Sequence, residues 1–122
     1  MENTRTDGFS HFLDEAERLL RAEPSAEQVI AVRTAKDSVL HLLNRSIMDG
    51  GTGDEDAFFA MLSDRGERAV RAVLCMWHDG TIDLPSIHFR RRLIELCPGN
   101  KDAAVLLQGE GTLITKKLEA LM

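Results

Sequence analysis

Two cysteines and two histidines form the first group whose side chains could do chemistry. Cys75 and His78 are three residues apart, so a helix would place both on one face. His88 and Cys97 follow, and thiolate and imidazole groups are the donors that zinc prefers. The spacings Cys-x2-His and His-x8-Cys do not by themselves define a zinc site. Whether the four residues converge on a metal stays open, and no metal site is predicted.

The segment from Asp79 to Ser86 resembles the second half of an EF-hand calcium loop. Asp79, Gly80 and Asp83 take the fifth, sixth and ninth positions of that loop. The first position would be Cys75 and the twelfth Ser86, so the first carboxylate and the bidentate final glutamate are missing. Because calcium needs six to eight oxygen ligands, the segment is expected to be a turn rather than a calcium site.

Arginines form the one basic cluster of the sequence. Arg90, Arg91 and Arg92 are consecutive, and three more arginines precede them at three-residue spacing. Together they are a candidate basic face for nucleic acid: Arg65, Arg68, Arg71, Arg90, Arg91 and Arg92. The chain carries a net charge of −5, however, and an acidic protein repels a phosphate backbone unless basic groups are concentrated locally.

Nucleophilic catalysis would need a serine or cysteine near a histidine and a carboxylate. Asp83, Ser86 and His88 are close in sequence, but they precede or begin an expected helix, where Asp and Ser commonly act as caps. No nucleophile elbow and no phosphate-binding glycine loop is present. The sequence therefore predicts no catalytic residue and no cofactor, and the balance is against an enzyme without deciding the question.

Helical spacing of apolar residues dominates the elements that would position these groups. Apolar residues recur three and four apart from Phe9 to Leu20, and Pro24 ends that helix. Gly50-Gly51 ends a second helix, while Gly109 and Gly111 interrupt the last one. No segment alternates with the period of two typical of a half-buried strand. The predicted helices cover residues 9–22, 25–48, 54–62, 65–78, 85–97 and 100–122.

This pattern predicts an all-α protein, a single domain (1–122) folded as an antiparallel bundle of about five or six helices. The length of 122 residues fits one domain, and 43% hydrophobic with 29% charged residues is typical of a soluble globular protein. No apolar run approaches the roughly 20 residues of a membrane span. Two cysteines and no recognisable export signal favour the cytoplasm.

The leading functional hypothesis is a small interaction or regulatory protein without catalytic activity, with a protein partner or a second copy bound. Lys36 falls within the apolar stripe of the expected second helix, and Leu118 and Leu121 end the chain without a polar tail. These three are the candidate partner contacts. Two alternatives stay open: a nucleic-acid-binding regulator using the arginine face, and a helical domain that binds a small ligand or a metal.

Overall fold

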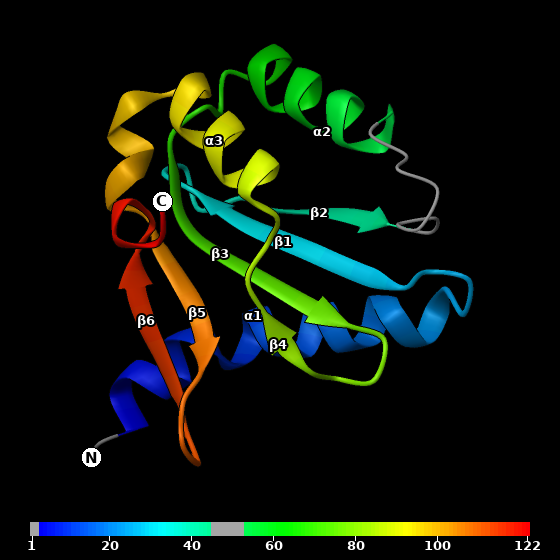
Figure 1. Cartoon of the computed structure of the whole chain (residues 1–122). Coiled ribbons are helices and arrows are strands. Elements are labelled where there is room, and N and C mark those ends of the chain that lie inside the picture. Colours follow the sequence, from blue (N-terminus) through cyan, green and yellow to red (C-terminus); the bar gives the residue numbers. More distant parts are fainter. Residues whose placement is uncertain (1–2, 45–52) are drawn as a thin grey trace.

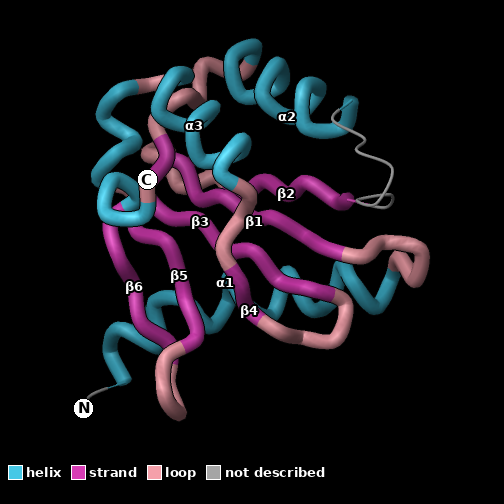
Figure 2. The backbone as a smooth tube through the Cα atoms, in the orientation of Figure 1, coloured by secondary structure: helices cyan, strands magenta, loops and turns pink. Residues whose placement is uncertain are grey.

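A six-stranded mixed sheet with helices on both faces forms the centre of the protein (Figures 1 and 2). The computed structural model describes residues 3–44 and 53–122. The strand order is β2-β1-β3-β5-β6, and the short β4 pairs with Cys75 and Met76 of β3, just beyond the residues that pair with β5. The strands are β1 (Gln28–Thr34), β2 (Val39–Asn44), β3 (Val70–Trp77), β4 (Ile82–Asp83), β5 (Ala104–Gln108) and β6 (Leu113–Lys117).

Two hydrophobic layers hold the helices against the sheet. Helix α1 (Asn3–Ala22) covers one face, where Phe12, Ala16 and Leu20 are buried. Helices α2 (Gly53–Asp64) and α3 (Ile87–Leu96) cover the other face, as Figure 1 shows. Two 3-10 helices, Pro98–Asp102 and Leu118–Leu121, complete this second layer.

The prediction of an all-α bundle is wrong, because three of the expected helices are strands. The residues from 28 to 44 form an antiparallel hairpin whose turn contains Asp37 at a φ of 66°. Gln28–Val32 in β1 and Ala72–Met76 in β3 are buried because helices cover both faces of these strands. A strand buried on both faces reads as a continuous apolar run, so it shows no alternation. Residues 45–48 of the expected second helix lie outside the described residues.

The last expected helix is a hairpin of β5 and β6. The Gly109 N–H donates to the carbonyl of Thr112 at 2.7 Å, and Gly111 has a φ of 75°, which favours glycine. The glycines that interrupt the helical pattern therefore mark the turn. Helices α1, α2 and α3 do lie where helices were predicted. None of the helices within residues 3–44 and 53–122 is long and apolar enough to cross a membrane.

Candidate active site

Glu55, in the first turn of α2, is a buried carboxyl with one oxygen that accepts no hydrogen bond from the described residues. Its side chain is 11% exposed, and Oε1 has no hydrogen-bond partner among the described residues. His88 Nε2 lies 3.4 Å from this oxygen, and Arg92 Nη1 lies 3.9 Å from it. A buried acceptor that the protein leaves unsatisfied costs about 1–3 kcal/mol, so Glu55 is a candidate for contact with a ligand.

Helix α3 presents His88 and Arg92 to Glu55 from one turn apart. The helix begins at a local signal in the sequence: the Ser86 hydroxyl accepts a hydrogen bond from the Phe89 N–H at 3.1 Å. This cap places His88 in the first turn, with 60% of its side chain exposed. Residues i and i+4 of a helix lie on one face, so Arg92 reaches the same carboxyl.

Arg92 is held in place by two further contacts. Its Nη1 is ion-paired with Asp56 of α2, and its guanidinium carbon lies 4.6 Å from the centre of the Phe59 ring. Such a cation–π contact is worth about 0.5–2 kcal/mol. The starts of α2 and α3 are thereby joined through charged groups of both signs.

Burial dominates the electrostatics of Glu55. Removal from water raises the pKa of its carboxyl, and Asp56 adds to the rise; the charges of His88 and Arg92 oppose it in part. The net effect raises the pKa above its usual value, so Glu55 keeps a proton to a higher pH than an exposed glutamate. A partly buried carboxyl with a shifted pKa beside a histidine is a candidate acid–base group.

The group of cysteines and histidines considered for a metal is spread over the fold. Cys75 is buried within β3, and burial raises the pKa of its thiol to about 12. His78 is exposed just after β3, His88 lies on α3, and Cys97 is half-buried at the end of α3. Both cysteines are free thiols. Within residues 3–44 and 53–122 no three His, Cys, Asp or Glu side chains could hold a metal together.

The candidate basic face divides between two regions. Arg65 forms an ion pair with Glu67 at 2.8 Å, Arg71 lies 3.9 Å from Asp37, and Arg68 is exposed. On α3, Arg91 is exposed, whereas Arg90 donates to the backbone carbonyls of Pro85 and Leu121. With Arg92 paired to Asp56, three of the six arginines have carboxylate partners.

The three candidate partner contacts, Lys36, Leu118 and Leu121, do not form one surface. Lys36 is exposed in the turn between β1 and β2 rather than on a helix. Leu118 is fully buried, and Leu121 is half-buried against the same layer. Of the two leucines, only Leu121 therefore offers surface to a partner.

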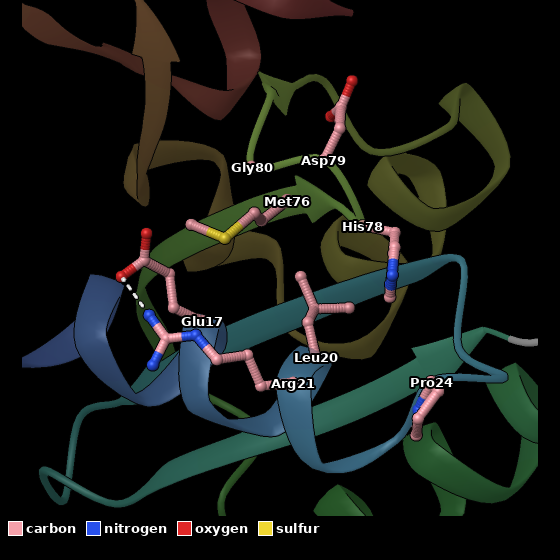
Figure 3. A pocket seen from close by; sticks show the side chains of 8 residues that line it. All are labelled: Glu17, Leu20, Arg21, Pro24, Met76, His78, Asp79 and Gly80. Carbon is pink, nitrogen blue, oxygen red and sulfur yellow. Dashed lines mark ion pairs between the residues drawn. The ribbon is translucent and has the colours of Figure 1, made fainter.

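A separate hollow of about 390 Å³ lies between the end of α1 and the β3–β4 turn (Figure 3). Leu20 and Met76 supply its apolar wall, and Arg21 and Glu17 form an exposed ion pair at 3.8 Å along its side. Within the described residues this hollow contains no unpartnered buried polar atom. Its described lining therefore lacks an unsatisfied buried atom of the kind found at Glu55.

Sequence reasoning missed Glu55 and considered its neighbours for other roles. His88 was considered for a metal or a catalytic triad, and Arg92 for nucleic acid. Glu55 itself was given no chemical role. No local signal joins it to His88, because 33 positions separate them and only the packing of α2 beside α3 brings them together.

Comparison with known proteins shows which fold this is. No family model and no curated protein sequence matches the chain. Solved structures do match. Cytidine deaminase from Burkholderia pseudomallei has a TM-score of 0.66 and 20% identity, covering 93% of this chain and 95% of its own. The enzyme from Mycobacterium leprae has a TM-score of 0.64 and 14% identity, covering 90% of this chain and 92% of its own. The enzyme from Mycobacterium tuberculosis has a TM-score of 0.63 and 16% identity, covering 89% of each chain.

These likenesses also correct the leading functional hypothesis. A non-catalytic helical interaction protein is wrong, since the architecture is α/β and its structural neighbours are enzymes. The two helical alternatives rested on the same mistaken architecture. The fold of this chain is that of the cytidine deaminases.

Proposed function

We propose that the chain binds an aminopyrimidine nucleoside, such as cytidine, and exchanges a proton with its base through Glu55. The observation that carries the proposal is the buried Oε1 of Glu55, which lies near His88 and Arg92 of α3 but accepts no hydrogen bond from the described residues. The nature of the ligand is suggested by the structural neighbours, which are described as cytidine deaminases. The raised pKa of the carboxyl supports its role as the proton donor.

The cytosine ring and a protonated carboxyl are complementary. Cytosine presents an amino donor beside the N3 acceptor, and a protonated carboxyl has one donor and one acceptor. Glu55 can donate its proton to N3 while its second oxygen accepts from the amino group. His88 lies close enough to return a proton to Glu55.

Zinc, the usual metal of nucleobase deaminases, does not fit this chain. Those enzymes carry the pattern H-x-E followed by P-C-x-x-C, in which zinc ligands are His or Cys and the glutamate is the acid–base group. Here the corresponding segments are Gly53-Asp54-Glu55 and Pro85-Ser86-Ile87-His88-Phe89. The glutamate and the proline are present, but Gly53, Ser86 and Phe89 occupy the three ligand positions. No zinc-activated water is therefore part of the proposal.

Calorimetric titration of cytidine into the whole chain tests the proposal. We expect saturable binding that exceeds the binding of uridine, whose base has a protonated N3 and no amino group. Glu55→Ala should weaken cytidine binding about tenfold or more, the effect of losing one buried hydrogen bond of about 1.4 kcal/mol. Glu55→Gln should keep most of the binding, since an amide offers the same donor and acceptor, but should not release a proton.

Glu95→Gln is the matched control, because Glu95 is an exposed residue of α3. The proposal fails if cytidine does not bind, or if Glu55→Ala binds it as tightly as Glu95→Gln does.

The two free cysteines fit a reducing compartment, so we expect the protein to act in the cytoplasm.

A further inference from the structure

The three positions that would hold zinc in a deaminase pattern have other structural tasks in this chain. Ser86 caps α3, with its hydroxyl accepting the Phe89 N–H at 3.1 Å. Phe89 is fully buried, and its ring centre lies 5.0 Å from that of Phe59 and 6.2 Å from that of Phe58. Gly53 has no side chain to donate. A buried aromatic ring thus occupies the position where a thiolate would be needed.

A permanent positive charge lies beside the same carboxyl. The Arg92 guanidinium is 3.9 Å from Glu55 Oε1, and its side chain is only 25% exposed. An arginine side chain stays protonated throughout the ordinary pH range. A zinc ion next to Glu55 would be repelled by this cation, and the described residues offer no three metal ligands to offset that repulsion.

We infer that the site around Glu55 works without a metal, and that the Arg92 guanidinium, laid on the Phe59 ring, supplies the fixed positive charge beside Glu55. The ring and Asp56 hold the guanidinium on two sides. A guanidinium has five N–H donors, so these contacts leave donors for a ligand oxygen or for Glu55 once it has lost its proton. Arg92 is thus a positioning residue that stabilises the charged form of Glu55.

Whether the site binds a metal does not depend on which ligand it takes. The effect of Arg92 on nucleoside affinity, by contrast, rests on the proposed function. Two experiments separate these statements. The first measures the zinc content of the protein without any nucleoside. The second measures the titration of the Glu55 carboxyl, and cytidine affinity is then measured on the same variants.

The first experiment loads the full chain with equimolar Zn²⁺, removes unbound metal by gel filtration and measures metal content by mass spectrometry. We expect far less than one zinc per chain, and unchanged cytidine binding in EDTA. Stoichiometric zinc that is lost in His88→Ala or Ser86→Ala would overturn the inference. Zinc that both variants retain is bound away from Glu55, and that result agrees with the inference.

The second experiment compares Arg92→Met, Arg92→Lys and the control Arg91→Met. Methionine keeps an apolar stem against Phe59 but removes the charge, and Arg91 is the exposed neighbour on α3. The readout is the ¹³C chemical shift of the Glu55 carboxyl during a pH titration of folded protein. Arg92→Met should shift the titration to higher pH, Arg92→Lys should restore part of the shift, and Arg91→Met should leave it unchanged.

Cytidine affinity then tests the link to function. Because cytosine binds the protonated carboxyl and Arg92→Met favours that form, Arg92→Met should bind cytidine several-fold more tightly than Arg91→Met at neutral pH. An unchanged Glu55 titration in Arg92→Met would overturn the role of Arg92, whatever the ligand. If cytidine fails to bind the wild-type chain while the Glu55 titration shifts as expected, the proposed function fails and the inference about Arg92 stands.

Discussion

Glu67 shows how a single buried carboxylate is stabilised outside the candidate site. It lies after α2, and the Thr34 hydroxyl donates to its Oε1 at 2.7 Å while Arg65 Nε donates to its Oε2 at 2.8 Å. Hydrogen bonds from Ser38 and Thr34, followed by Arg65, lower the pKa of Glu67 to about 2. This carboxylate therefore ties the turn of the β1–β2 hairpin to the segment between α2 and β3.

Glu67→Gln should make the free energy of unfolding less dependent on pH in the acidic range. Since the folded pKa lies below the ordinary value of 4.5, ionised Glu67 stabilises the fold at pH values above 4.5. That contribution is lost as the pH falls from 4.5 towards 2. Urea unfolding at pH 7 should show the variant less stable than wild type, and the difference should shrink at pH 3. Asp64→Asn, at an exposed carboxylate nearby, is the control; a difference that is equal at both pH values would contradict the prediction.

The residues of the candidate site differ in how far the sequence could reveal them. Ser86 was considered as a cap, together with Asp83, because Asp and Ser commonly occupy a helix start, and the structure shows Ser86 accepting the Phe89 N–H. Glu55 was not recognised, because its neighbours His88 and Arg92 come from another helix. An acid–base role depends on burial and on a tertiary neighbour, and neither is visible in local sequence.

At the scale of elements, Asn100 joins the segment before β3 to the end of α3. Its side chain is fully buried; Oδ1 accepts from the Val70 N–H, and Nδ2 donates to the carbonyls of Arg68 and Leu93. The start of β3 and the end of α3 are thereby fixed to the 3-10 helix Pro98–Asp102. This arrangement also sets the direction of α3, which carries His88 and Arg92.

Asn100→Ala should destabilise the protein by about 3 kcal/mol, because it leaves the buried Val70 N–H without its acceptor and the Arg68 carbonyl without the Asn100 donor, while the Leu93 carbonyl keeps the Cys97 N–H. Lys101→Ala, at the exposed next residue, should change stability by less than about 0.5 kcal/mol. Chemical unfolding followed by circular dichroism measures both. Equal stabilities of the two variants would show that the Asn100 hydrogen bonds are replaced by water.

The same scale explains which elements the sequence predicts. Helix α1 has one apolar face against the sheet, so its three- and four-residue spacing is clear. Strand β1 is buried on both faces, and its Val29–Val32 run fits a central helix as well as a central strand. The glycines at 109 and 111 were read as a helix interruption, although a hairpin turn explains both of them.

At the scale of the whole molecule, the end of the chain closes the layer that contains the candidate site. The Leu118 N–H donates to the carbonyl of Ala103 at 2.9 Å, and its side chain is fully buried with Phe89 and Leu93 in one hydrophobic cluster. Arg90 on α3 donates to the carbonyl of Leu121. The last residues therefore support α3 from the side opposite to α2.

Leu118→Ala should accordingly destabilise the protein by about 3 kcal/mol, since it opens a cavity in a packed layer. Leu121→Ala should cost about 1 kcal/mol, because that side chain is only half-buried. Thermal and urea unfolding measure these effects, and sedimentation of each variant reports any change in self-association. A loss of self-association in Leu121→Ala with stability unchanged would show that the residue acts in a contact between chains. The pairing of His88 with Glu55 can be followed in Leu118→Ala through the ¹⁵N shifts of the imidazole. If this pairing weakens together with a large loss of stability, the C-terminal turn positions α3 for the site.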